Sequence, residues 1–167
     1  AGPMSQTLGQ SIVVENRPGA DSLIATKAVA AAEPDGYTVL VAVSSHTINP
    51  ALYPGSKVDP VKDFAPIGMI GEAANFLVVH PSVPAQSAEE LIALAKARPG
   101  ELNYASSASV TMMATELFRH MAGLQMTSIA YKGAGQAVPA LIGGEVQLSI
   151  TSLISMLPHV RSGKVRA

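Results

Sequence analysis

The sequence predicts an α/β fold on the strength of three observations. Short apolar, β-branched runs alternate with segments of helical periodicity, and Gly, Pro, Asn or Asp stand at most of the junctions. Hydrophobic residues make up 48% of the chain and charged residues 14%, a balance typical of a folded core. Strands that alternate with helices of ~8–13 residues indicate right-handed β–α–β units over a largely parallel sheet.

In the first half of the chain, strands are expected at 12–14, 37–43 and 67–70. The run 37–43 is almost continuously apolar, which is typical of a strand buried on both faces of a parallel sheet. A helix is expected over 22–32, with Asp21 or Ser22 as its cap and Pro34 beyond its end. A loop and a short helix are expected over 44–53.

In the second half, strands are expected at 76–79, 102–105, 127–131 and 146–150, and another begins at Val165. Ser87 and Glu90 form a capping box that starts a helix, and Pro99-Gly100 ends it. Further helices are expected after Gly135 and from Leu153. Between 110 and 121, apolar residues recur at helical spacing before a C-capping Gly123: Val110, Met113, Leu117, Phe118 and Met121. Core packing is expected of Met112, Met113, Met121 and Met126.

Small residues at 71–75 separate two of these strands and suggest a lobe boundary. The chain is therefore divided into a partial first lobe, residues 1–74, and a second lobe, residues 75–167.

Composition excludes several classes of function. The net charge is −1 without a basic cluster, so we expect no nucleic acid as a partner. The chain has no Cys, and His46, His80, His120 and His159 lack metal-ligand spacing, so neither a metal nor a cofactor is expected. No apolar run approaches the ~18 residues of a membrane span, and residues 1–10 do not resemble a signal peptide.

Small polar residues follow three of the predicted strands at the point where a helix begins. They are Ser44-Ser45-His46-Thr47, the segment 105–109 with three Ser, and Tyr131-Lys132-Gly133-Ala134-Gly135. Helix N-termini carry unpaired N–H groups and a partial positive charge, so such corners can bind anions. Plain helix capping would explain one Ser at each corner, but three Ser exceed what a cap requires.

Catalytic motifs are weak by comparison. The chain contains neither a Gly-x-Ser-x-Gly elbow nor a His-Glu-x-x-His motif. Ser45 beside His46 is the best candidate for a nucleophile and a base, and an α/β hydrolytic or ligand-modifying enzyme stays open as an alternative. A ligand-sensing signalling module is a third reading. No catalytic residue is assigned.

A series of strings across the whole chain resembles the substrate-binding proteins of tripartite tricarboxylate transporters, the Bug or TctC family. In order, the strings are VVENRPGA at 13–20, PDGYT at 34–38, INPALY at 48–53, DPVKDFAPI at 59–67, VVHPSVP at 78–84, LNYAS at 102–106, YKG at 131–133, LPHV at 157–160 and GKVRA at 163–167.

The resemblance implies a type II periplasmic binding protein-like fold, with two α/β lobes and a cleft between them, here truncated at both ends. It implies a small mono-, di- or tricarboxylate as ligand, a two-component membrane permease as partner, a periplasmic location with the signal peptide outside this chain, and no catalysis. Carried over position by position, the ligand contacts fall on Ser44, Ser45, His46, Ala105, Ser106, Ser107, Tyr131, Lys132, Gly133 and Thr151.

The chain departs from the family pattern at several positions. Asp21 and Ser22 stand where the family commonly has glycines, and Thr151 stands where it commonly has Asp. Because Thr cannot pair with a ligand ammonium, Thr151 favours plain carboxylates over amino acids. The chain is also shorter than the ~250–300 residues expected of a two-lobed binder, so a homo-oligomer that pairs open sheet edges is a further expectation.

Overall fold

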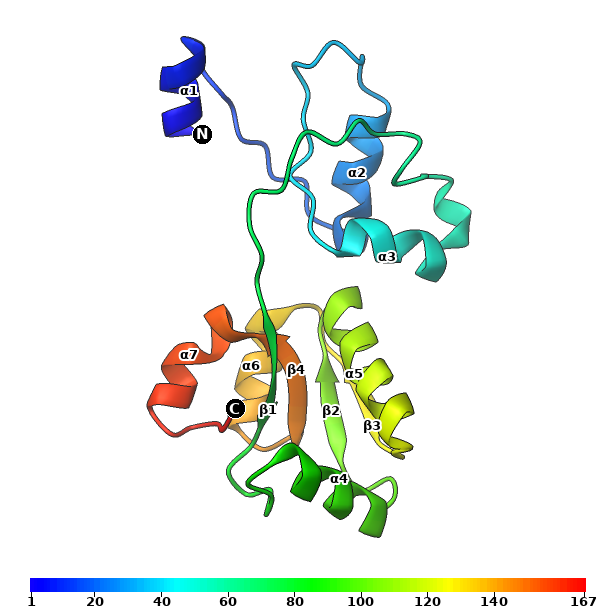
Figure 1. The fold of residues 1–167 in the computed structure, drawn as a ribbon, viewed down its shortest axis with the longest axis vertical. Helices are drawn as coiled ribbons and strands as arrows, with labels where there is room; N and C mark the ends of the chain where they lie inside the picture. The colour runs from blue at the N-terminus through cyan, green and yellow to red at the C-terminus, as the bar shows by residue number, and fades with distance from the viewer. The chain divides into compact units, whose positions relative to one another are not determined.

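The computed structural model describes residues 1–167, which form two compact units, Ala1–Pro66 and Ile67–Ala167. Figure 1 shows the elements of both. No helix in either unit is both long enough and apolar enough to cross a bilayer.

The first unit is built from short helices and irregular segments and contains no strand. Its helices are α1 (Gly2–Leu8), η1 (Ala20–Ser22), α2 (Leu23–Ala30), α3 (Ser45–Leu52) and η2 (Pro54–Ser56). The helices expected over 22–32 and within 44–53 are therefore confirmed. Ser22 holds the N-cap position of α2, although its side chain makes no capping hydrogen bond.

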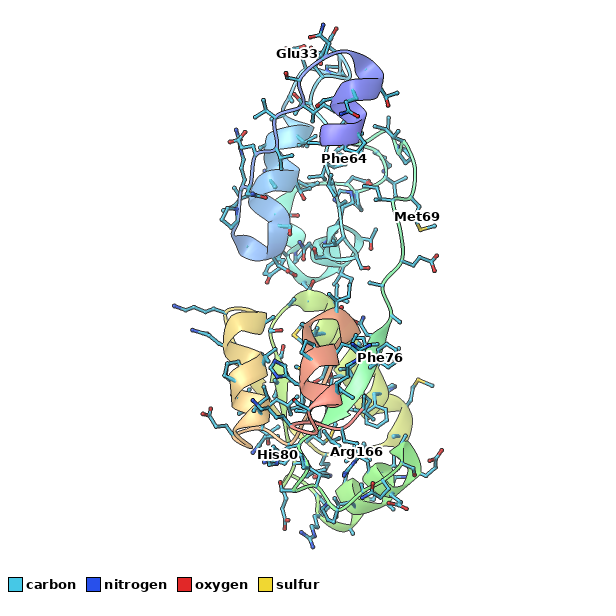
Figure 2. The ribbon with its side chains drawn as sticks, turned by 90° about the vertical axis from the view of Figure 1, so that its left-hand side faces the viewer. Glu33, Phe64, Met69, Phe76, His80 and Arg166 are labelled. Carbon is cyan, nitrogen blue, oxygen red and sulfur yellow. The ribbon has the colours of Figure 1, made fainter.

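The prediction of strands at 12–14, 37–43 and 67–70 is wrong. All three segments are irregular and exposed: Val13 is 87% exposed, Val41 74% and Ile70 87%. Figure 2 shows Met69 projecting away from the irregular segment that carries it. A strand requires a neighbour that accepts and donates its ladder hydrogen bonds, and these segments find none within the chain.

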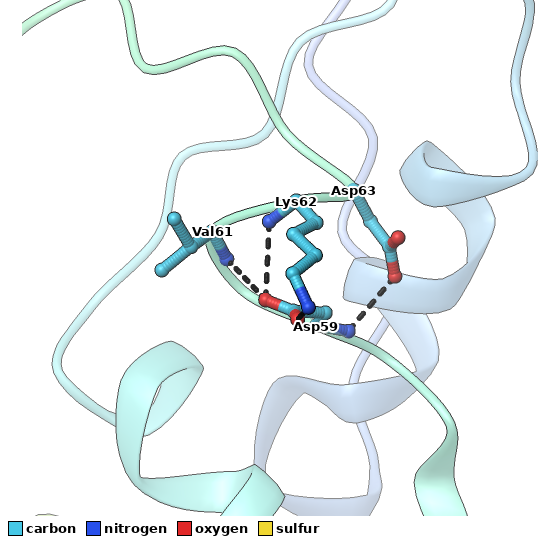
Figure 3. Close-up of polar contacts among 4 residues, drawn as sticks. All are labelled: Asp59, Val61, Lys62 and Asp63. Carbon is cyan, nitrogen blue, oxygen red and sulfur yellow. Dashed lines mark hydrogen bonds and ion pairs between the residues drawn. The ribbon is translucent and has the colours of Figure 1, made fainter.

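A turn at Asp59–Asp63 organises the end of the first unit (Figure 3). Asp59 Oδ1 accepts hydrogen bonds from the amides of Val61 and Lys62 at 3.0 and 3.1 Å, and Asp63 Oδ2 accepts one from the Asp59 amide at 2.8 Å. The hydrogen bonds from the amides of Lys62 and Val61 are the largest causes that lower the pKa of Asp59. Side chains therefore satisfy backbone donors where no regular element does so.

The second unit contains a four-stranded sheet, and its strands confirm the α/β prediction. They are β1 (Asn75–Val79), β2 (Asn103–Ser106), β3 (Thr127–Ala130) and β4 (Leu148–Ser152), in the order β1-β4-β2-β3. β2 runs parallel to both β3 and β4, whereas β1 is antiparallel to β4. In place of the strand expected from Val165, Arg166 makes a single antiparallel bridge to Val79.

Helices cover both faces of this sheet (Figure 1). Helices α4 (Ala88–Ala97) and α5 (Ser109–Ala122) belong to the apolar cluster that contains Tyr104 and Leu148. Helices α6 (Ala134–Ile142) and α7 (Leu153–Arg161) belong to the cluster that contains Val78 and Ala105. Because successive side chains of a strand point to opposite faces, the neighbours Tyr104 and Ala105 serve different clusters.

The serine half of the capping box and the C-cap of the second unit are confirmed, whereas the Glu90 carboxylate bonds an amide one residue before the N-cap. Ser87 Oγ accepts a hydrogen bond from the Glu90 amide at 3.2 Å, and the Glu90 carboxylate accepts one from the Gln86 amide at 2.6 Å. Gly123 ends α5 with a left-handed φ of 65°, which glycine adopts at little cost.

The prediction for the apolar residues of α5 is only partly confirmed: Phe118 packs against the core cluster, and Met126, which follows the helix, is buried. Met113, Leu117 and Met121 are exposed, whereas Thr111 and Thr115 are buried. Burial of these threonines is inexpensive because their hydroxyls bond to backbone carbonyls: Thr115 Oγ1 donates to Thr111 O at 2.9 Å, and Thr111 Oγ1 to Ala108 O at 2.9 Å. Apolar spacing alone does not reveal this compensation.

Candidate functional site

Three helix N-termini of the second unit lie at one edge of its sheet. Because β2, β3 and β4 are mutually parallel, their carboxyl ends meet at this edge, and α5, α6 and α7 begin directly after them (Figure 1). The antiparallel β1 begins at the same edge, and Phe76 lies directly opposite Thr151. Figure 2 shows Phe76 and His80 at opposite ends of β1.

The predicted residues of the second unit gather at this edge. Ala105 and Ser106 end β2 and are buried, and Thr151 is buried in β4 next to the last residue of that strand. The amide of Tyr131 donates to Ser106 O at 2.8 Å, which places the start of the 131–133 segment beside the end of β2. Parallel topology thus brings together residues that are far apart in the sequence.

The corner between β2 and α5 is folded around Thr111. Its hydroxyl accepts hydrogen bonds from the amides of Ser107 and Ala108 at 3.4 and 3.2 Å. These two amides are therefore occupied within the protein. What this corner offers a ligand lies in the serine hydroxyls and in the first turn of α5.

The corner between β3 and α6 is more open. A Cβ added at Gly133 or Gly135 would meet no atom within 4 Å, so the backbone of this corner can be approached closely. The Lys132 amide donates to Gln136 Oε1 at 3.2 Å, and the Lys132 side chain is exposed. Gly133 holds the N-cap position of α6.

Charge at this edge favours an anion. The corner segments 105–109, 131–135 and 151–155 contain one Lys and no Asp or Glu. Three helix N-termini add partial positive charge at the same place. Such an edge can accept a carboxylate through hydroxyls, amides and one ammonium group.

A partly buried network anchors β2 behind the edge. The Tyr104 hydroxyl donates to Glu116 of α5, and Arg119 donates to the same carboxylate at 2.6 and 3.0 Å. The hydrogen bond from Arg119 and then that from Tyr104 lower the pKa of Glu116, whereas burial raises the pKa of Tyr104. The network ties the strand that ends at Ser106 to the helix that follows.

The remaining predicted residues, Ser44, Ser45 and His46, begin α3 in the first unit. Ser44 is its N-cap and makes no side-chain capping bond. Ser45 is 2% exposed, and neither its Oγ nor the buried His46 Nδ1 has a hydrogen-bond partner in the protein. The His46 ring meets Phe64 edge to face, with the ring centroids 4.7 Å apart. Ser45 Oγ and His46 Nδ1 thus do not bond to each other as a nucleophile and a base would.

Two side chains at these corners were missed from the sequence. Phe76 reaches the edge because β1 is antiparallel, and strand direction is not readable from a short apolar run. Asn49, 1% exposed, lies one turn after Ser45 on the same face of α3, and its Oδ1 has no partner in the protein. Its place in INPALY, four residues after Ser45, is the signal that could have identified it.

Two hollows of the molecule lie away from the predicted residues. One of about 230 Å³ is lined by Ser82, Arg98 and Gln147 among others, at the amino ends of β2 and β4. Another, of about 510 Å³, lies beside the C-terminal end of α2 and η2 in the first unit. Neither contains a predicted site residue, and no group of three or more His, Asp or Glu could hold a metal ion.

The fold is that of periplasmic binding proteins, whose solved structures this chain resembles. A family model described as "Tripartite tricarboxylate transporter family receptor", TctC, matches residues 1–167. The chain belongs to this family, which confirms the resemblance in the sequence.

Comparison with individual proteins supports the assignment. The chain is 39% identical to Protein BugT of Bordetella pertussis over 98% of its own length and 52% of that protein. It is 37% identical to R. palustris Rpa4515, solved with adipate, with a TM-score of 0.88 over 99% of this chain and 56% of that one. It is 30% identical to MatC of Rhodopseudomonas palustris, solved with bound malate, with a TM-score of 0.82 over 98% and 57%. The chain thus spans about half the length of the relatives it matches.

Proposed function

We propose that the chain contributes to a periplasmic solute-binding protein that captures a small carboxylate for a tripartite tricarboxylate-type permease, without chemistry of its own. The observation that carries the proposal is that three helix N-termini lie at one edge and that their corner segments hold a Lys and no acidic residue. The adipate and malate in the two solved relatives are both carboxylates, which supports the same class of ligand here.

In this proposal most of the predicted residues have a stated role. The hydroxyls of Ser106, Ser107 and Thr151 donate to a carboxylate, and Gly133 lets the ligand approach the backbone at the start of α6. Lys132 contributes a positive charge. Ser44, Ser45 and His46 provide a second group of donors at the start of α3, where Ser45 Oγ has no protein partner. The division into lobes at 1–74 and 75–167 is part of the proposal.

A thermal-unfolding screen tests the function. Adipate and malate are expected to raise the unfolding temperature, whereas the neutral diamide of adipic acid, which keeps the chain length but lacks the charge, is not. At a hundredfold excess of ligand over its dissociation constant, the stabilisation is about 2.7 kcal/mol. A folded protein that responds to no carboxylate would refute the proposal.

The contribution of Lys132 is tested by Lys132→Gln, with Lys96→Gln in α4 as the matched control. Both lysines are exposed, but Lys96 does not lie at a corner. Since an exposed charge pair is worth up to about 1 kcal/mol, Lys132→Gln should weaken adipate binding about two- to fivefold. Equal losses of adipate affinity in the two variants would show that Lys132 is not part of the site.

A further inference from the structure

Three consecutive residues of the first unit adopt the left-handed backbone conformation. Ala20, Asp21 and Ser22 have φ values of 46°, 52° and 73°, and among the non-glycine residues of the chain only Lys57 shares a positive φ. For L-residues this region is sterically unfavourable, and successive left-handed residues without glycine are rare. Such a segment persists only where its surroundings hold it in place.

Asn49 forms a hydrogen bond to the middle of this segment and thereby anchors it. Its Nδ2 donates to the backbone carbonyl of Asp21 at 2.7 Å, across 28 positions of sequence. Only the amide nitrogen can donate to a carbonyl, so this bond also fixes the orientation of the side-chain amide. The next carbonyl, that of Ser22, accepts a hydrogen bond from Thr26 Oγ1 at 3.0 Å within α2.

The position of Asn49 has an energetic cost that its one bond must offset. The side chain is 1% exposed, and Oδ1 is buried without a partner in the protein. A buried acceptor that has lost water is unfavourable. A purely apolar residue would fill the same place without that cost, so the hydrogen bond to Asp21 is the distinctive contribution of asparagine here.

Asn49, which forms this hydrogen bond, lies on the same face of α3 as Ser45 of the candidate ligand corner. Asn49 lies one turn after Ser45, and both are buried where α3 contacts η1. A shift of the 20–22 segment would therefore change the packing against the α3 face that carries Asn49 and Ser45. The helix that begins at this corner thus contacts a segment with three left-handed residues, to which Asn49 makes a long-range hydrogen bond.

We propose that Asn49 is a positioning residue, which holds the left-handed segment 20–22 against α3 and thereby shapes the corner at Ser44–His46 for the ligand. The inference rests on the proposed carboxylate binding. It has a specific consequence, because glycine adopts φ values of 46° and 73° without penalty. With glycine at positions 20 and 22, two of the three left-handed residues lose their steric penalty, and the segment depends less on Asn49.

Four proteins test this consequence: the wild type, Asn49→Ala, the double variant Ala20→Gly/Ser22→Gly, and the combination of all three changes. Asp21 is left in place so that its own contacts are preserved. Asn49→Ala should weaken adipate binding about tenfold, corresponding to about 1.4 kcal/mol. The glycine variant should bind within about twofold of wild type, and the combination within about threefold of the glycine variant. Asn16→Ala, at an exposed asparagine of the same unit, should change nothing.

The outcome that overturns the proposal is additivity: Asn49→Ala costs the same affinity in both backgrounds, or costs nothing in either. If Asn49→Ala alone fails to fold, the glycine background must restore folding, and failure to do so overturns the proposal as well. If the wild type binds no carboxylate, the proposed function fails by itself. The same four proteins then test the anchoring of the segment by Asn49 through urea unfolding, where the losses must again be non-additive.

Discussion

The two units differ in how they cover their apolar side chains. Every buried hydrophobic residue of the chain lies in the second unit, between Val78 and Val165. The buried residues of the first unit are all polar: Thr26, Ser45, Asn49 and Ser56. Its apolar side chains, such as Tyr37 and Val41, remain largely exposed.

This difference shows what a strand needs that a helix does not. Helices α2 and α3 form from bonds between residues four apart, so local signals suffice. The run 37–43 has the composition of a buried strand, but within this chain it finds no neighbour to complete its ladder. In the second unit each strand has a partner, and helices cover both faces of the sheet.

The largest effect is expected from removing matched leucines in the two units. Leu148→Ala deletes a fully buried side chain of β4 and should lower the free energy of unfolding by about 2–5 kcal/mol. Leu8→Ala removes a side chain that is 63% exposed and should cost less than about 0.5 kcal/mol. Urea unfolding followed by circular dichroism measures both. Similar losses would mean that the first unit has a core of its own.

Helix caps provide a second comparison between the units. Ser87 caps α4 through its hydroxyl, so Ser87→Ala should cost about 1 kcal/mol in the free energy of unfolding. Ser44 holds the same position at α3 without a capping bond, so Ser44→Ala should cost little stability. Under the proposed function, the same Ser44→Ala variant should nevertheless weaken carboxylate binding. A large loss of stability from Ser44→Ala would show that its role is structural.

The network behind the strand-end edge is tested by Tyr104→Phe. The change removes the hydroxyl that donates to Glu116 and keeps the buried ring. The free energy of unfolding should fall by about 1 kcal/mol, the usual net worth of one hydrogen bond. Phe118→Tyr is the control, because it exchanges Phe and Tyr at another ring that packs against the same cluster. A fully stable Tyr104→Phe variant would exclude the network as an anchor of β2.

The smallest effect is a pH dependence of the second unit. The pKa of Glu116 is below its usual 4.5 in the folded state, so the contribution of this carboxylate is present above pH 4.5 and is lost as pH falls through the lower, folded pKa. Because Glu116 and Arg119 are both more than a third exposed, the change should stay below about 1 kcal/mol. Glu116→Gln should flatten the stability profile below pH 4.5. An unchanged profile in that variant would assign the dependence to other carboxylates.

Sequence predicted the local features well and the non-local ones unevenly. The cap at Ser87, the left-handed Gly123 and the strands of the second unit were recognisable because each rests on neighbouring residues. The strand at 37–43 was wrong because its composition says nothing about a partner. The core packing predicted for Met113 and Met121 was wrong because Thr111 and Thr115 of α5 bond their hydroxyls to nearby backbone carbonyls and so can be buried.

The candidate site divides in the same way. Strand-to-helix corners are visible in a sequence as small polar residues, and parallel strands bring Ser106, Tyr131 and Thr151 to one edge. The position of Phe76 at this edge could not be predicted, because it depends on the direction of β1 and no local sequence pattern encodes strand direction. The role of Asn49 could not be predicted either, because it rests on a hydrogen bond to a residue 28 positions away. Contacts of that kind follow from the fold and cannot be read before it.

The central claim is that a carboxylate binds at the starts of helices, and amide-resolved NMR during titration with adipate tests it most directly. We expect the largest shifts of amide signals at 105–109, 131–135 and 151–153, with a second group at 44–46, and none with the neutral diamide. Shifts confined to the hollow near Ser82 and Arg98, or spread evenly over both units, would contradict the account.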